Sequence, residues 1–502
     1  MALVTVLALT AAAPQAWAQQ FGGTLRVAMI GEPPTLDIHN STATITTHIA
    51  WHVMEGLFTL DADFGITPLL AESYTVSDDG LRYVFYIRRG VTFHDGSPLT
   101  ARDVVASLAR WGRVAVVGQN LFRNVARLEA VDDSTVELEL SAPMGTLLPA
   151  LANPLQMAAI YPADLANSTD GPLTTIIGTG PFRLVEWLPD SHIRMARFEN
   201  YAARDEEPNG YGGRRVAYVD ELYFYAVPDP ATRIFGLEAG DYDVADWIPT
   251  DNYIDLQLAP GVEPVIVKPG EWVGAHWNTQ RGPFADGNLR KAAQAALNME
   301  LIMLNAFGDP AFYRLDPGLM FQETIWWNDA GKEHYDQRNM ELARRYLAAS
   351  SYNGEEIRWL TTQEYDWMYA SSLAAVEQLR ELGLNIRLDV VDWGTVIAQR
   401  TNYDVFVTGM PLYADPTQLP VLNCGWVRFY CDEEHVRLVN ALYETVDLAA
   451  RQEILRAIQA RFYEEAAALK FGDFFRLRGR RDYVQGMQAM PEPFFWNVWI
   501  ER

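Results

Sequence analysis

One segment, residues 71–104, constrains the fold of this chain more than any other part of its sequence. Residues 81–87 are mostly β-branched and aromatic, so they favour a strand. Residues 91–93 predict a short second strand after a break. Thr100 then has the chemistry of a helix N-cap, and Asp103 stands at the capping-box position ahead of an apolar run. The segment therefore predicts a hairpin, a turn and a capped helix in that order.

This order of elements resembles the signature segment of the family 5 extracellular solute-binding proteins, which are the peptide, opine and nickel receptors of bacterial ABC importers. Further stretches resemble the family in the same sequence order, so that the resemblance spans nearly the whole chain after its leader. They are the opening strand and turn at 23–37, the EGLF piece at 55–58, the GTGPF turn at 178–182, the strand, loop and helix at 220–243, and the start of a second lobe at 276–296.

The resemblance implies an α/β fold, namely a two-lobed periplasmic binding protein of type II, cluster C, with an additional strand-rich subdomain in lobe I. A chain of 502 residues is long enough to bury two or more cores. Two crossings between the lobes would make a hinge, and hinge closure would bury a solute. The expected division is a signal peptide at 1–18, lobe I at 19–60 and 179–270, its inserted subdomain at 61–178, lobe II at 271–472, and a return to lobe I at 473–502.

The N-terminal residues have the composition of an export signal. Residues 2–13 are apolar and lead to an A-x-A-like cleavage site at 16–18, although no Lys or Arg precedes the apolar stretch. No cysteine follows the cleavage site to carry a lipid anchor, and no apolar run reaches the ~18 residues of a membrane span. We expect a soluble, monomeric protein of the periplasm whose signal peptide is cleaved near Ala18.

Cysteine usage is compatible with export. The chain has only Cys424 and Cys431, with six residues between them. In an oxidising compartment a pair this close favours a local disulfide. Two buried thiols, or a weak metal pair without partner ligands, remain as alternatives.

The charge balance excludes nucleic acid as a partner. Lys and Arg total 40 against 65 Asp and Glu, a formal net charge of −25, whereas binding to phosphate backbones needs a basic face. We interpret the charge as an acidic, solvated surface that keeps a secreted protein soluble, with a cationic ligand as the alternative.

Motifs of the common enzymes are absent. The chain contains no H-E-x-x-H, G-x-S-x-G, G-x-x-x-x-G-K-[ST] or C-x-x-C pattern, so we expect neither catalysis nor a cofactor or bound metal. His48 and His52 lie four residues apart in a predicted helix and could chelate a metal, so a nickel-type ligand remains an alternative. Two surface histidines are the favoured interpretation of this pair.

Candidate ligand-binding residues come first from the expected second lobe. Trp393 follows a predicted strand at 386–391 and resembles the Trp that lines the cleft in peptide-binding members. Arg400 matches a cleft-side Arg of some members and would face an anionic group bidentately. A core position for Trp393 and a surface position for Arg400 are the alternatives.

The loop at 411–417 departs from the peptide-binding pattern. Peptide-binding members carry an Asp four residues before the Pro of this loop, which pairs with the amino terminus of the peptide. Here Leu412 takes that position. Asp415 is the candidate replacement, because a buried, unpaired ammonium costs several kcal/mol. N-capping or turn formation by Asp415 is the alternative, and Tyr413 of the same loop is a further candidate.

The crossing into the second lobe supplies two more candidates. Residues 271–278 alternate as a strand, so Trp272 and His276 share one face. The resemblance favours that face as the one that looks into the cleft. Tyr365 and Trp367, on a loop before a predicted helix, are candidates of lower rank.

In lobe I, Glu32 and Pro33 resemble the segment whose backbone pairs with an extended peptide by strand addition. Two consecutive prolines remove two N–H donors there, which weakens the case for such pairing. We therefore expect a periplasmic receptor that captures a short peptide or peptide-like solute and delivers it to an ABC permease and ATPase in the inner membrane. A receptor for an oligosaccharide, an opine or a nickel complex is the alternative, followed by an enzyme on the same scaffold.

Overall fold

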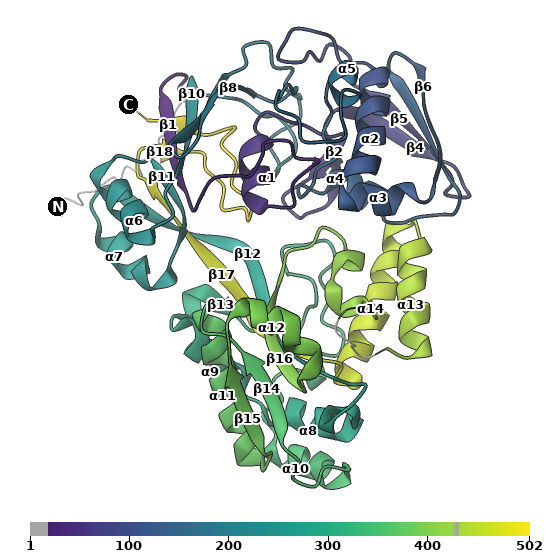
Figure 1. Ribbon diagram of the computed structural model, residues 1–502, viewed down its shortest axis with the longest axis vertical. Coiled ribbons are helices and arrows are strands. Elements are labelled where there is room, and N and C mark those ends of the chain that lie inside the picture. Colours follow the sequence, from purple (N-terminus) through teal and green to yellow (C-terminus); the bar gives the residue numbers. More distant parts are fainter. Residues whose placement is uncertain (1–18, 425, 427–430, 502) are drawn as a thin grey trace, which may run out of the picture.

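Two long strands join two lobes in the computed structural model, which describes residues 19–424, 426 and 431–501. These strands are β12 (Val262–Trp277) and β17 (Leu469–Arg481), which pair antiparallel from lobe to lobe. Figure 1 shows them running from the upper lobe to the lower one. The two-lobed α/β architecture predicted from the sequence is therefore present.

One mixed sheet of 11 strands in the described part of the chain runs through both lobes, in the order β15-β14-β16-β12-β17-β11-β1-β10-β9-β8 with β13 added to β17. The continuity of this sheet fixes how the lobes meet. Its other strands are β1 (Thr24–Met29), β8 (Phe182–Leu188), β9 (His192–Arg197), β10 (Glu221–Ala226), β11 (Val244–Ile248), β13 (Tyr313–Arg314), β14 (Ile357–Thr361), β15 (Ile386–Val390) and β16 (Val405–Pro411).

A separate four-stranded sheet, ordered β4-β5-β7-β6, belongs to the upper lobe. It and the elements packed around it comprise β4 (Ala71–Val76), β5 (Arg82–Ile87), β6 (Val125–Asp132), β7 (Thr135–Leu140), the pair β2 (Phe58–Leu60) and β3 (Ile66–Pro68), and the helices α2 (Ala101–Val114), α3 (Val116–Phe122), α4 (Leu147–Ala152) and α5 (Ala163–Ala166).

The signature segment lies in this sheet and its first helix. The predicted strand at 81–87 is β5, and the predicted capped helix is α2, where the Thr100 backbone N–H donates to Asp103 Oδ2 at 2.8 Å. The predicted second strand at 91–93 is wrong. Thr92 forms only an isolated bridge with Pro98, because β5 already has β4 and β7 as its neighbours.

The remaining helices cover the large sheet in the two lobes. In the upper lobe they are α1 (Thr44–Ala50), α6 (Pro230–Ala239) and α7 (Tyr253–Leu258); in the lower lobe they are α8 (Gly287–Ala296), α9 (Met299–Phe307), α10 (Met340–Ala349), α11 (Asp366–Leu382), α12 (Trp393–Gln399), α13 (Glu433–Glu444) and α14 (Leu448–Glu464). Helix α11 ends at Gly383, which takes a left-handed φ of 107° as its C-cap.

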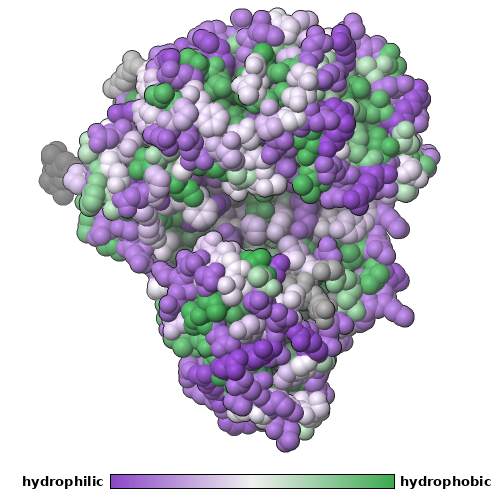
Figure 2. Space-filling model, in the orientation of Figure 1, coloured by the Kyte–Doolittle hydropathy of each residue, from purple (hydrophilic) through white to green (hydrophobic). Residues whose placement is uncertain are grey.

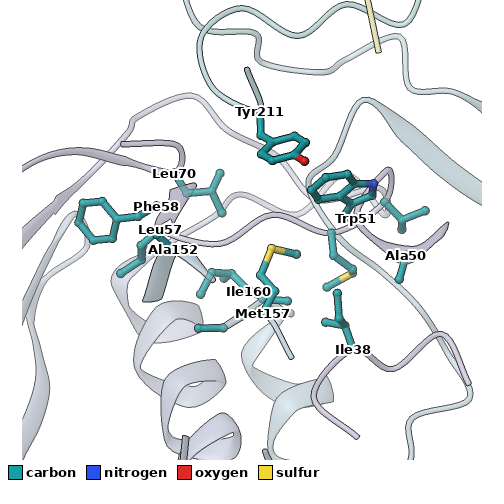
Figure 3. Close-up of a cluster of buried hydrophobic side chains, with 14 of the residues drawn as sticks. Ile38, Ala50, Trp51, Leu57, Phe58, Leu70, Ala152, Met157, Ile160 and Tyr211 are labelled. Carbon is teal, nitrogen blue, oxygen red and sulfur yellow. The ribbon is translucent and has the colours of Figure 1, made fainter. Parts of the chain in front are cut away.

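A buried cluster in the upper lobe joins distant parts of the chain. Trp51 lies 5.3 Å from Trp496, centroid to centroid, and 4.8 Å from Tyr211. Figure 3 shows Trp51 and Tyr211 side by side above Met157. The C-terminal segment, with its short pair β18 (Val484–Gln485) and β19 (Trp499–Ile500), thus packs onto the first lobe. The domain boundaries given above remain a prediction.

Two further findings bear on the sequence predictions. Cys424 and Cys431 form a disulfide, so the local disulfide is confirmed over the free thiols and the metal pair. Within the residues that the structure covers, no helix has both the length and the apolar character needed to cross a membrane.

Candidate functional site

Strand direction points to the gap between the lobes. In the upper lobe β1, β10 and β11 are parallel, and β11 runs with β12 because both are antiparallel to β17. In the lower lobe β14, β15 and β16 are parallel to one another, and β16 is antiparallel to β12. The carboxyl ends of both groups therefore face each other across the gap. Ligands of open α/β sheets bind outside such ends.

The molecular surface is hollowed along this gap, as Figure 2 shows. The lobes also touch on the side away from β12 and β17, toward α13 in Figure 1. There the Gly145 N–H donates to the Tyr443 carbonyl at 2.8 Å, and the Ile325 N–H donates to the Asp63 carbonyl at 2.9 Å. The gap is thus bounded by the crossing strands at one end and by these contacts at the other.

Trp247 projects from the upper wall. Its backbone is left-handed, with a φ of 53°, and its side chain is 39% exposed although it belongs to β11. The Arg476 guanidinium lies 4.8 Å from its ring centroid. Trp247 closes a cavity of about 380 Å³ at the ends of β1 and β11, whose lining is Met29, Ile30, Gly31, Glu32, Thr44, Ile45, His48 and Trp247.

Ion pairs occupy the upper end of the crossing strands. Arg478 donates to Asp246 Oδ1 at 2.8 Å, and His48 pairs with Glu492. Burial opposes ionisation of Glu492, but His48 beside it lowers the pKa of that carboxyl below its usual value. These four side chains thus form two ion pairs, although Asp246 Oδ2 is buried without a hydrogen-bond partner.

Glu271 lies beside them without a partner. Its carboxylate accepts no hydrogen bond and forms no ion pair within the described residues, and the side chain is only partly buried. Burial raises its pKa above the usual glutamate value; Arg476 acts in the opposite direction, and Glu492 adds to the rise. A methyl group at Gly409 would lie 2.5 Å from Glu271 Oε2 and 3.1 Å from Trp367 Cη2, so all three meet.

An aromatic row leads from Glu271 along the lower wall. Trp367 lies 5.0 Å from Phe474 and 6.2 Å from Tyr365, and Tyr365 makes an edge-to-face contact with Trp393 at 5.5 Å. Tyr365 is 43% exposed and the two Trp side chains are half-buried. The structure therefore brings Trp393, Tyr365 and Trp367 together, as a row at the carboxyl ends of β14 and β15.

Trp272 and His276 share one face of β12, as the alternation predicts, but that face is packed. Trp272 is fully buried and His276 is 1% exposed. Burial lowers the pKa of His276 to about 3. Neither side chain presents surface to the gap in this conformation, whereas Glu271 on the opposite face does.

Asp415 has the structural role that the sequence left as its alternative. The carboxylate is completely buried, and Arg451 donates to Oδ2 at 2.7 Å and to Oδ1 at 2.9 Å. It also caps the short turn Pro416–Gln418 by accepting from the Thr417 backbone N–H. Its charge is already matched, so it has no free charge for an ammonium group. Tyr413 of the same loop is half-buried, and burial raises its pKa to about 12.

Arg400 is half-buried with its guanidinium over two rings, 5.9 Å from the centroid of Phe406 and 5.8 Å from that of Trp426. No carboxylate of the described residues pairs with it, and desolvation lowers its pKa. Its contact with an anionic group of a solute remains a prediction.

Glu32 and Pro33 lie at the end of β1. The Glu32 carboxylate accepts from the Trp187 indole N–H and from the Asp190 backbone N–H at 3.2 Å, so it ties β1 to the turn between β8 and β9. Pro33 is buried. Both border the upper wall of the gap.

The interpretation of His48 and His52 as surface residues is wrong. His48 is 2% exposed and His52 is fully buried. The His52 Nδ1 contacts the Ile49 carbonyl at 3.2 Å, and Nε2 accepts from the Phe495 N–H at 3.0 Å. Because both its ring nitrogens are engaged, the pair offers no chelate.

Sequence reasoning missed Glu271, Arg476 and Trp247. Glu271 begins the alternating stretch at 271–278 of β12, but the resemblance directed attention to the other face of that strand. Arg476 stands among five basic residues on β17, and nothing in the sequence separates it from them. Trp247 follows no recognisable motif, and its left-handed backbone carries no sequence signal in a non-glycine residue.

Comparison with known proteins agrees with this geometry. A probable peptide ABC transporter periplasmic-binding protein of Sinorhizobium fredii is 27% identical over 423 residues, which are 82% of this chain and 76% of that protein. An ABC transporter substrate-binding protein of Listeria monocytogenes has the same fold, with a TM-score of 0.84 at 20% identity over 96% of this chain and 100% of its own. The binding protein AgaA of A. tumefaciens R10, solved in complex with agropinic acid, has a TM-score of 0.69 at 27% identity over 96% of this chain and 99% of its own.

The predicted fold class and family are thereby confirmed. The model of the bacterial extracellular solute-binding proteins, family 5 Middle, matches residues 65–423. This match covers more than half of the chain and includes the signature segment, the crossing strand and the aromatic row. The chain belongs to the bacterial extracellular solute-binding proteins of family 5.

Proposed function

We propose that the protein is the solute-binding receptor of an ABC importer and that it closes on a short peptide or peptide-like solute. One observation carries this: the carboxyl ends of the parallel strands in both lobes meet across a gap lined by Trp393, Tyr365 and Trp367. Aromatic walls offer large apolar area with little rotamer entropy to lose, which suits varied side chains. The description of the Sinorhizobium relative as a peptide transporter component supports the solute class.

The remaining steps follow from this role. The chain is exported with residues 1–18 as signal peptide, acts as a monomer in the periplasm, and hands its solute to a permease and its ATPase. It binds its solute without turnover, since the sequence carries none of the common hydrolase, P-loop and zinc motifs. Lobe I, its inserted subdomain and lobe II follow the boundaries expected from the sequence.

The predicted site residues divide into three groups. Trp393, Tyr365 and Trp367 contact the solute from the lower wall, and Arg400 meets an anionic group. Tyr413, Glu32 and Pro33 border the gap, while Trp272, His276 and Asp415 support it from the core.

Native mass spectrometry of the exported protein, before and after denaturation, tests the proposal because receptors with closing clefts retain solute. Peptide masses would support it. A retained opine would assign the solute class represented by AgaA with agropinic acid instead. Chemical conversion of the retained solute on incubation would contradict a receptor role.

A further inference from the structure

Two opposite charges remain unmatched where the gap meets the crossing strands. Asp246 pairs with Arg478 and Glu492 with His48, which leaves Glu271 and Arg476. Arg476 donates one hydrogen bond, to the Pro491 carbonyl at 3.2 Å, and its Nε is buried without a partner. Neither Glu271 nor Arg476 forms an ion pair with any residue that the structure describes.

The strand register places these two side chains on one face. Glu271 of β12 is paired with Phe474 of β17, and Arg476 lies two residues further along β17, where a register shift in β12 brings it opposite Val267. Long side chains at such diagonal positions can reach a common point. The structure shows no ion pair between Glu271 and Arg476, so one small group can lie between their charges. Gly409 keeps the space above Glu271 open, since a methyl group there would collide with its carboxylate.

Burying unpaired charges is costly, and lobe closure would remove more water from both. A solute that brings an ammonium to Glu271 and a carboxylate to Arg476 would replace that water with charge-assisted hydrogen bonds. Trp247 over the Arg476 guanidinium holds the cation in place, and Trp367 beside Glu271 directs the rest of the solute along the aromatic row.

We propose that Glu271 and Arg476 together bind an α-amino-acid head group, in which ammonium and carboxylate sit on one carbon, and that Glu271 thereby supplies the ammonium partner that Asp415 does not. This inference rests on the proposed receptor function and narrows its solute class. The amino terminus of an ordinary peptide lacks the neighbouring carboxylate, whereas γ-glutamyl peptides and amino-acid conjugates carry both charges.

An isomer pair tests this directly. γ-Glutamyl-alanyl-glycine and α-glutamyl-alanyl-glycine have the same composition and net charge, but only the γ isomer has both groups on one carbon. Calorimetry should show that the wild type, dialysed free of retained solute, binds the γ isomer roughly tenfold or more tightly. Glu271→Gln and Arg476→Gln should each abolish that preference.

Matched controls lie at the other end of the same sheet. Glu356 and Arg387 pair at 2.7 Å beside the amino ends of β14 and β15, so Glu356→Gln and Arg387→Gln should keep the preference. Glu271→Gln should not lower the melting temperature of the solute-free protein, because it removes an unpaired charge. A purely structural role for Glu271 predicts lowered stability with the preference intact.

Equal affinity for the isomers, a preference for the α isomer, or no binding of either at millimolar concentration would overturn the inference. Retained peptides together with equal isomer affinity would leave the receptor function standing and remove only the head-group assignment. Chemical conversion of the retained solute together with a γ preference would do the reverse: it would contradict the receptor function and keep the head-group assignment.

Discussion

Arg451 donates two hydrogen bonds to Asp415, from Nη1 to Oδ2 at 2.7 Å and from Nη2 to Oδ1 at 2.9 Å. Both side chains are at most 3% exposed, so this is a buried, bidentate ion pair. It joins the loop after β16 to α14. Because Asp415 is paired with Arg451, it stabilises the fold rather than binding the solute. An ammonium group of the solute therefore needs another carboxylate as its partner.

Removing one member of this pair should destabilise the protein without changing what it binds. Asp415→Asn or Arg451→Met alone leaves a buried charge uncompensated and should lower the free energy of unfolding by about 3–5 kcal/mol. The double variant should lose less than the sum, because it leaves no uncompensated charge. Urea denaturation measures this. If Asp415→Asn lost binding of γ-glutamyl-alanyl-glycine at unchanged stability, Asp415 would be a ligand-binding residue and not a structural one.

Trp393→Ala should weaken binding of retained solute about tenfold or more and leave the melting temperature of the solute-free protein nearly unchanged. The side chain is half-buried and meets Tyr365 edge to face, so its loss opens no closed cavity. Trp359, fully buried in the lower-lobe core, is the control: Trp359→Ala should cost about 3–5 kcal/mol of stability. If Trp393→Ala matched Trp359→Ala in stability and kept full affinity, Trp393 would be a core residue.

Local chemistry explains which elements were predictable. The start of α2 follows from Thr100 and Asp103, three residues apart, whose reciprocal hydrogen bonds need nothing else from the fold. The end of α11 follows from Gly383 for the same reason. The strand predicted at 91–93 does not form, although these residues have strand propensity. Both edges of the neighbouring strand β5 are already paired, with β4 and with β7.

The charged part of the site depends on contacts that no local pattern contains. Glu271 has no ion-pair partner because Arg478 is paired with Asp246 and His48 is paired with Glu492. That outcome depends on residues brought together from three distant segments. The aromatic row was predictable one residue at a time, through resemblance for Trp393, but its continuity to Trp367 is a property of the packed sheet.

Burial of His52 should make folding sensitive to acid. Burial lowers its pKa from 6.5 to about 3, so the unfolded chain takes up the proton first. The stabilisation is therefore complete above pH 6.5 and is lost as the pH falls toward 3, by up to ~1.4 kcal/mol per pH unit. His52→Gln should flatten this dependence in urea denaturation at a series of pH values. Measurements near pH 8 give the cost of the substitution itself, and an unchanged slope in the variant would contradict the assignment.

Glu271 should make solute binding sensitive to acid as well. Its raised pKa means that it becomes protonated at a higher pH than the ordinary glutamate value of 4.5, and only the ionised form attracts an ammonium group. Affinity for γ-glutamyl-alanyl-glycine should therefore fall as the pH is lowered through that raised pKa, approaching about tenfold per pH unit below it. Glu271→Gln should bind weakly with little pH dependence over the same interval, since it has no carboxylate to protonate.

The effect of Glu271 on stability has the opposite sign. Its raised pKa means that the folded protein favours the neutral form. The free energy of unfolding of the wild type should therefore fall as the pH rises through the folded pKa, and this loss should be absent from the Glu271→Gln variant. Calorimetry and urea denaturation over one pH series measure both effects, and parallel pH profiles for wild type and variant would exclude Glu271 as the titrating group.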